Sequence, residues 1–224
     1  MRGKARPMKK SESLPSGIAS RAVLILERLA RLVRAGDHAS GLAPAQWEAL
    51  RYLARANRFS RTPAALADYL GATRGTVSQT LIALEEKGLI NKIVSPRDRR
   101  SVELSLTPEG AALLSQDALK DLARDVDASG EANGLVQGLE AVLHQALVRR
   151  GGRAFGICRT CRHFRPGGPG GKASNSHYCT LLDAPLSDAD AGLERGDARR
   201  IPSCTAFFGD ALQPAMYDAA DVAG

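Results

Sequence analysis

The chain has 224 residues, of which 44% are hydrophobic and 25% charged, and this composition excludes a largely disordered protein. Aromatic residues make up only 4%, which argues against a barrel or sandwich built on large cross-strand aromatic pairs. The formal net charge is +7 at pH 7, and an excess of that sign suits a polyanionic partner. No apolar run has the ~18–20 residues of a membrane helix, and none follows the basic start as in a signal peptide. We therefore expect a cytoplasmic protein without a membrane partner.

Changes in composition predict four segments along the chain. Residues 1–16 are basic and contain proline, glycine and serine, so we expect a flexible basic arm. Residues 17–150 carry helical apolar spacing and are expected to form the main domain. All four cysteines lie in a glycine- and proline-rich stretch that we assign to an irregular module over 151–210. Residues 211–224 are expected to be a mobile acidic tail.

Helix start and stop signals outline a helix-turn-helix in the main domain. An amphipathic helix starts at Ile18, and we expect Gly36 to end it. A second helix begins near Pro44, because proline suits the first turn of a helix. The stretch from Thr62 to Gly71 predicts a short capped helix stopped by glycine, and Thr73 caps the next helix. Two short helices joined by a tight turn at the glycine have the outline of a helix-turn-helix.

The residues after these helices predict a wing. Two β-prone runs, 89–94 and 101–106, flank a polar loop with one proline and three arginines, and strand, basic loop and strand directly after a helix-turn-helix form a wing. A single helix is expected to open at Thr107, with Ala111, Leu114, Ala118 and Leu122 on one side. A last helix is expected to end at Arg149–Gly152, and its apolar positions are Leu135, Leu139, Val142, Leu143, Ala146 and Leu147.

Several of these segments together resemble the MarR family of winged helix-turn-helix transcriptional regulators. They are Leu42–Trp47, Leu66–Gly71, Leu84–Ile90, Asp98–Arg100 and Leu104–Gly110. The resemblance spans about residues 18–148 and implies a mainly α fold with a small β-wing, flanked by dimerisation helices. It also implies a homodimer that binds double-stranded DNA at a palindromic operator.

The resemblance places the second helix of the motif, about residues 73–87, in the major groove. The residues at its start are short or polar, as base-edge and phosphate contacts require. The predicted DNA-binding residues of this helix are Thr73, Arg74, Gly75, Thr76, Ser78 and Gln79. Gly75 departs from this pattern, since glycine weakens a helix interior by roughly 0.8–1 kcal/mol. It either allows close backbone approach to phosphate or is simply tolerated.

The wing loop supplies a second set of predicted DNA contacts, because its cations favour phosphate. These residues are Arg97, Asp98, Arg99 and Arg100. By the resemblance, Arg99 reaches the minor groove and Asp98 braces the wing through an arginine.

The four cysteines predict a metal site in the C-terminal module. Cys158 and Cys161 form a CxxC pair, and Cys179 and Cys204 follow singly. A chain segment too rich in glycine and proline to build its own core needs a cross-link, and four thiolates around a metal provide one. Disulfides are the alternative. The layout resembles small modules related to high-potential iron–sulfur proteins, and this likeness implies a [4Fe-4S] cluster, with Zn²⁺ as the alternative. His163 and His177 flank cysteines and are alternative ligands or surface residues.

These features together predict a DNA-binding regulator, and a repressor in particular, whose binding is modulated by an iron–sulfur cluster that senses redox state, oxygen or iron. One alternative is a regulator with a structural zinc site and a small-molecule effector. Another is an electron-transfer or enzyme accessory subunit that retains a winged-helix fold. We find no nucleophile–base pair, phosphate-binding glycine loop or paired-carboxylate motif, so we do not expect an enzyme.

Overall fold

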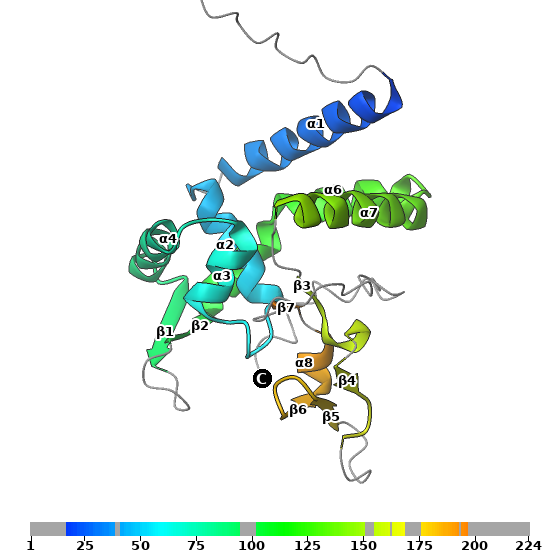
Figure 1. Ribbon diagram of the computed structural model, residues 1–224. Helices are drawn as coiled ribbons and strands as arrows, with labels where there is room; N and C mark the ends of the chain where they lie inside the picture. The colour runs from blue at the N-terminus through cyan, green and yellow to red at the C-terminus, as the bar shows by residue number, and fades with distance from the viewer. Residues whose placement is uncertain are drawn as a thin grey trace, which may run out of the picture.

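A computed structural model shows a mainly helical protein with a small two-stranded wing and a separate C-terminal module (Figure 1). The structure describes residues 17–38, 41–94, 102–150, 155–161, 163–168, 176–192 and 194–196. Within these ranges, no helix is long and apolar enough to cross a membrane.

The winged-helix body consists of four helices and one hairpin. The helices are α2 (Pro44–Arg55), α3 (Pro63–Leu70), α4 (Arg74–Glu86) and α5 (Pro108–Leu113), and the strands are β1 (Ile90–Val94) and β2 (Val102–Leu106). The strands pair antiparallel, with Ile90 opposite Leu106 and Val94 opposite Val102. This order of elements confirms the helix-turn-helix and wing predicted from the sequence.

The predicted caps fix both helices of the helix-turn-helix. The Thr62 hydroxyl accepts a hydrogen bond from the Ala65 amide, and Gly71 ends α3 in the left-handed conformation at φ 61°. The Thr73 hydroxyl accepts in the same way from the Thr76 amide and starts α4. The turn between the helices is therefore set by local chemistry.

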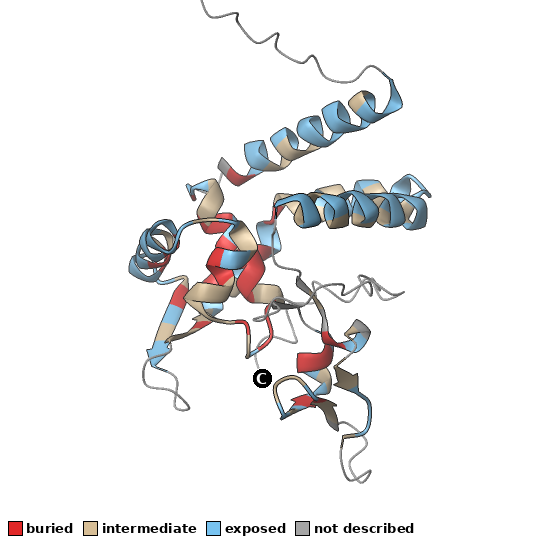
Figure 2. Ribbon diagram, viewed as in Figure 1, coloured by how far each residue is buried: buried red, intermediate tan, exposed pale blue. Residues whose placement is uncertain are grey.

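The hydrophobic core lies around α2, as the concentration of buried residues in Figure 2 shows. Trp47 of α2 is 1% exposed. From α4 the core receives Val77, Leu81 and Leu84, and from the wing strands Ile90 and Leu104. Helix α4 and the wing therefore both pack on the same helix, α2.

Three long helices extend from this body to the same side in Figure 1: α1 (Ile18–His38), α6 (Ala118–Ala128) and α7 (Ala132–Arg150). Two sequence predictions here were wrong. Helix α1 does not end at Gly36 but continues to His38, because Gly36 serves a close helix contact: a Cβ at that position would lie 2.6 Å from the Ala118 Cβ. The single helix expected from Thr107 is interrupted at Asp117, which caps α6 after a 3₁₀ turn over Leu114–Gln116.

Helices α1 and α7 leave large apolar side chains exposed in the single chain. In α1 these are Ile18, Val23, Leu24, Ile25, Leu26 and Leu32, and in α7 they are Leu135, Leu139, Val142, Leu143 and Val148. So many exposed apolar residues on two helices are typical of a surface that a partner covers.

The C-terminal module consists of short elements. Strand β3 (Phe155–Ile157) pairs antiparallel with β7 (Glu194–Gly196), and β4 (Phe164–Arg165), β5 (Ser176–Cys179) and β6 (Ala184–Ser187) form an antiparallel sheet in that order. A 3₁₀ turn over Cys158–Thr160 and the short helix α8 (Asp188–Gly192) complete it. The module packs against the loop between α2 and α3 of the same chain, where Phe59 joins its apolar cluster.

Candidate nucleic-acid interface and cysteine site

The first turns of α4 form a polar, exposed surface on the winged-helix body. All six residues predicted to contact DNA from this helix are exposed: Thr73, Arg74, Gly75, Thr76, Ser78 and Gln79. The hydroxyls of Thr73 and Thr76 lie 2.9 Å apart and hydrogen-bond to each other. The Thr73 hydroxyl is thus engaged in capping the helix, while Arg74, Ser78 and Gln79 have side-chain hydrogen-bond donors available for a ligand.

Gly75 is not required by packing within the protein. A Cβ built at this position meets only the Thr73 hydroxyl oxygen, at 3.9 Å, which is ordinary van der Waals contact. Its absence of a side chain therefore leaves the α4 backbone open to an outside ligand.

Helix α4 is fixed to α2 at its far end. The Lys87 ammonium donates to the Gln46 side-chain oxygen at 3.0 Å and to the Gly41 carbonyl at 3.2 Å. Lys92 of the wing also pairs with Glu85 at 2.6 Å. These contacts and the buried face of α4 hold the exposed face in a set direction relative to the wing.

The wing strands begin next to α4, and the tip of the wing lies outside the residues that the structure describes. Arg97, Asp98, Arg99 and Arg100 lie outside the described residues. Their predicted DNA contacts stay predictions.

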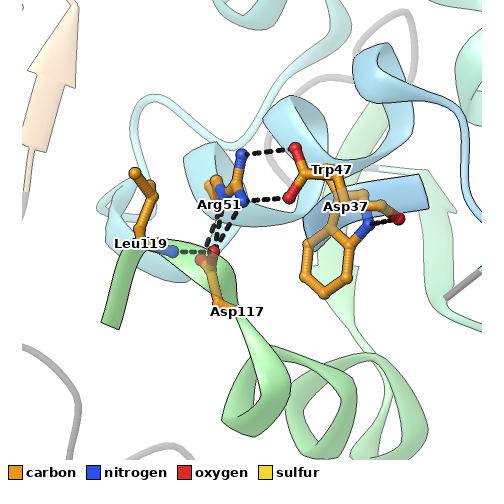
Figure 3. A network of polar contacts seen from close by, with 5 residues as sticks. All are labelled: Asp37, Trp47, Arg51, Asp117 and Leu119. Carbon is orange, nitrogen blue, oxygen red and sulfur yellow. Dashed lines mark hydrogen bonds and ion pairs between the residues drawn. The ribbon is translucent and has the colours of Figure 1, made fainter. Parts of the chain in front are cut away.

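A buried charge network links the long helices to the winged-helix body (Figure 3). Arg51 of α2 lies between two carboxylates: its Nε and one Nη bind Asp117 at 2.6–3.0 Å, and both Nη atoms bind Asp37 at 2.5 and 3.2 Å. Asp117 also accepts from the Leu119 amide at 2.9 Å, which starts α6. The Trp47 indole donates to the Asp37 carbonyl at 3.0 Å.

Hydrogen bonds to two carboxylates offset the burial of the Arg51 guanidinium. Burial opposes the charge on Arg51, but hydrogen bonds to Asp117 and Asp37 favour it, and the balance raises the pKa of the guanidinium above its ordinary value. The guanidinium also lies 5.2 Å from the centre of the Trp47 ring. Because Asp37 lies on α1 and Asp117 at the start of α6, this cluster joins both long helices to α2. Sequence reasoning missed it, since its members are far apart in the chain and look like surface charges.

The described cysteines lie in the small core of the module. Cys158 and Cys179 are 3% and 2% exposed and share an apolar cluster with Leu186. Cys161 is half-buried, and its amide donates to the Cys158 carbonyl at 2.9 Å in the tight turn expected of a CxxC pair. No disulfide joins these three residues to one another. Cys204 lies outside the described residues.

Among the described residues, no three His, Cys, Asp or Glu side chains come together as a group that could hold a metal ion. The four-cysteine site therefore stays a prediction. Two buried imidazole nitrogens in the described part of the module, His163 Nε2 and His177 Nδ1, have no hydrogen-bond partner. The other His177 nitrogen, Nε2, lies 2.8 Å from Asp188, and Arg159 donates to the same carboxylate at 2.6 Å. The hydrogen bonds from His177 and then Arg159 lower the pKa of Asp188.

The cysteine module contacts its own winged-helix body through three consecutive residues. The Asn57 side-chain amide donates to the Cys158 sulfur at 3.4 Å. Arg58 donates to the Pro185 carbonyl at 2.5 Å and lies 3.4 Å from a carboxylate oxygen of Asp190. Phe59 packs against the apolar cluster of the module. The described part of the module thus packs on the winged-helix body of the same chain.

Comparisons with known proteins identify the winged-helix segment. Residues 40–101 match the family model described as MarR family. A relative from Thauera aromatica, named "Putative transcriptional regulatory protein for hcr operon", is 30% identical over 110 residues, which are 49% of this chain and 65% of the relative. The match thus spans just under two thirds of the relative's length.

Two solved structures are also similar to part of this chain. An S. aureus MepR–DNA complex is 21% identical, with 60% of this chain and 99% of that chain covered and a TM-score of 0.47. A mutant MarR from E. coli is 23% identical, with the same two shares covered and a TM-score of 0.44.

The family match falls on the helix-turn-helix and the start of the wing, and it agrees with the sequence resemblance over this segment. The family match ends at residue 101, and the cysteine module lies beyond it.

Proposed function

We propose that this protein is a dimeric, sequence-specific DNA-binding transcriptional regulator that acts as a repressor. The observation that carries the proposal is the exposed polar start of α4 on a winged-helix body whose sequence matches the MarR family. Arg74 and Gln79 are the residues best suited to base edges, since Arg reads guanine and Gln reads adenine through paired hydrogen bonds. The name of the Thauera relative agrees with a role in transcription.

The exposed apolar faces of α1 and α7 support a homodimer. Burying these side chains against a second copy removes apolar surface from water, which favours association. A two-fold dimer presents two α4 helices to a palindromic duplex, and their spacing has to match one turn of DNA, roughly 34 Å.

The cysteines are proposed to hold a [4Fe-4S] cluster that controls this spacing. Three features of the module fit a thiolate-bound metal centre. Its apolar core is small, two cysteines from different elements are buried in it, and a buried amide N–H is directed at the Cys158 sulfur. The proposed ligands are Cys158, Cys161, Cys179 and Cys204, and the orphaned nitrogens of His163 and His177 offer alternative donors. Change or loss of the cluster in response to redox state, oxygen or iron is proposed to release repression.

DNA binding is tested by selecting duplexes from a random-sequence library and measuring the affinity of the enriched sequence. We expect a palindrome with half-sites one helical turn apart. The variant Arg74→Ala with Gln79→Ala should bind this sequence at least tenfold more weakly, because each paired base contact contributes about 1–3 kcal/mol of discrimination. Arg124→Ala on α6, which removes an exposed arginine remote from α4, is the matched control and should bind like the wild type. Equal binding by all three proteins, or no enriched sequence, contradicts the proposal and favours an electron-transfer or enzyme accessory subunit.

The metal is tested by anaerobic purification followed by absorbance spectroscopy and by assays of iron, sulfide and zinc. A broad visible band with four iron and four sulfide per chain is the expected result for a [4Fe-4S] centre. Cys179→Ser should lose the band and the iron. A colourless protein with one zinc per chain instead indicates a structural site, and regulation by a small-molecule effector is then the working hypothesis.

A further inference from the structure

The ends of α1 and α6 meet α2 at one buried point, where Arg51 binds a carboxylate from each (Figure 3). Asp37 lies in the last turn of α1, and its backbone carbonyl also accepts from the Trp47 indole of α2 at 3.0 Å. Asp117 caps α6, and its carboxylate accepts from the Leu119 amide at 2.9 Å. Side chains of α2 therefore hold both the end of α1 and the start of α6.

A close contact between α1 and α6 joins the third pair of helices at the same point. A Cβ at Gly36 would lie 2.6 Å from the Ala118 Cβ, so the two helices approach closely where Gly36 has no side chain. These two residues are the chain neighbours of the two carboxylates, Asp37 and Asp117. Because a planar guanidinium binds carboxylates in fixed directions, the ion pairs of Arg51 set an orientation as well as a distance. The three helices are thus joined pairwise within a few residues.

Helix α2 also holds the helix that is proposed to read DNA. Lys87 at the end of α4 donates to the Gln46 side chain in the first turn of α2 at 3.0 Å. Val77, Leu81 and Leu84 of α4 are buried in the core around α2. The direction of α4 relative to α2 is therefore fixed, and the angle between α2 and the long helices decides where α4 lies relative to those helices.

A small change in this angle is large on the scale of DNA. Packed helices lie 8–10 Å apart and are about 10–12 Å across, so the exposed face of α4 is roughly 15 Å from the axis of α2. A rotation of about 10° at Arg51 moves that face by roughly 2–3 Å, and two-fold symmetry doubles the change in the distance between the two α4 helices to about 5 Å. This exceeds the ~3.4 Å rise of one base pair.

We propose that Arg51 is a positioning residue that sets the half-site spacing which this protein recognises in DNA. The inference rests on the proposed function, because it requires a dimer and a palindromic site. Held between Asp37 and Asp117, the guanidinium keeps the long helices at one angle to α2, and so keeps the two α4 helices of the dimer at one distance. Its side chain is only 8% exposed, so Arg51 acts through this angle and not through a contact with DNA.

Arg51→Lys is the decisive variant. Lysine keeps the buried positive charge but replaces the planar fork by a point charge on a flexible stem, so it does not hold two carboxylates in fixed directions. Gly36→Ala is the second variant, since its methyl group pushes α1 away from α6 without a change of charge. Arg31→Lys is the matched control, because Arg31 pairs with a single carboxylate, that of Glu27, at 2.6 Å on an exposed part of α1.

The experiment measures the affinity of each protein for two kinds of duplex, under conditions in which circular dichroism shows the protein to be folded. One kind carries both half-sites of the enriched palindrome, with their spacing varied in steps of one base pair up to two base pairs either way. The other kind carries a single half-site. For the wild type and the control we expect one preferred spacing and at least tenfold weaker binding two base pairs away from it.

For Arg51→Lys and Gly36→Ala we expect a different dependence on spacing. The preferred spacing should shift by at least one base pair, or the affinities at all spacings should agree within threefold. The affinity for the single half-site should stay within twofold of the wild type, because the exposed face of α4 is unchanged. A residue that only stabilised the fold would not separate these two affinities.

The outcomes distinguish this inference from the function on which it rests. If no palindrome is enriched, or if the wild type binds every spacing equally, the proposed dimeric recognition fails and this inference fails with it. If the wild type prefers one spacing and Arg51→Lys keeps that preference, the inference alone is overturned. An equal loss of affinity for both kinds of duplex also overturns it. If Arg51→Lys does not fold, Gly36→Ala decides by the same measurements, and failure of both variants to fold overturns the inference, because this point then serves stability alone.

Discussion

Replacing Arg51 by methionine tests whether the buried charge network holds the long helices on the winged-helix body. The side chains of Asp37 and Asp117 are only 3% and 0% exposed, so Arg51→Met leaves two carboxylates buried and facing each other. Removing one partner of a buried ion pair costs about 3–5 kcal/mol. Against a typical domain stability of about 5–15 kcal/mol, this is a large loss.

The loss is measured by urea and thermal unfolding followed by circular dichroism. For a chain of this size each kcal/mol lowers the melting temperature by roughly 2–4 °C, so Arg51→Met should melt about 6–20 °C below the wild type. The control is Arg31→Met, which removes an ion pair to Glu27 of the same 2.6 Å length on the exposed face of α1. Its stability should be indistinguishable from that of the wild type, because solvent screens exposed pairs.

A second variant separates the charge from the packing of the side chain. Arg51→Met combined with Asp117→Asn keeps a capping residue for α6 and removes one of the two opposed charges. This double variant should be more stable than Arg51→Met alone. A loss below about 1 kcal/mol for Arg51→Met, or a double variant no better than the single one, refutes the reasoning.

Three further predictions concern pH, helix packing and assembly. The hydrogen bond from His177 lowers the pKa of Asp188. The stabilisation by this bond is therefore present above the ordinary carboxyl pKa and is lost as the pH falls through the lowered pKa of Asp188. In an NMR titration, His177→Gln should raise the pKa of Asp188. Gly36→Ala should destabilise the fold in the same urea assay, because a Cβ at this position would lie 2.6 Å from the Ala118 Cβ of α6. Leu32→Glu places a charge on the exposed apolar face of α1 and should shift the mass measured by light scattering from dimer to monomer; an unchanged mass would rule this face out as the interface.

Local chemistry explains why the helix-turn-helix could be predicted from the sequence. Thr62, Gly71 and Thr73 act through hydrogen bonds and backbone angles within a few residues of themselves, so their effect is visible in a short stretch of sequence. The apolar residues Val77, Leu81 and Leu84 of α4 recur at helical spacing and are buried. The exposure of the predicted DNA-contact residues at the start of α4 follows from the same pattern.

Long-range chemistry explains what the sequence did not reveal. Arg51 and Asp117 are 66 residues apart, and neither differs by its neighbours from an ordinary surface charge. The helical spacing of apolar residues continues from Leu114 to Ala118 across Asp117, so the sequence alone did not indicate a helix break there. The break became evident only with the contact between the Asp117 carboxylate and Arg51. Asn57 likewise stands in an ordinary polar loop, and its contact is with a cysteine 101 residues later.

Helix α2 is the element on which these separate connections converge. Near the middle of α2, Arg51 binds Asp37 at the end of α1 and Asp117 at the start of α6. Just after α2, Asn57 donates a hydrogen bond to Cys158 of the cysteine module. Gln46 in the first turn of α2 accepts from Lys87 at the end of α4, the helix that presents the predicted DNA contacts. The long helices and the cysteine module therefore both contact the helix that also holds the end of α4.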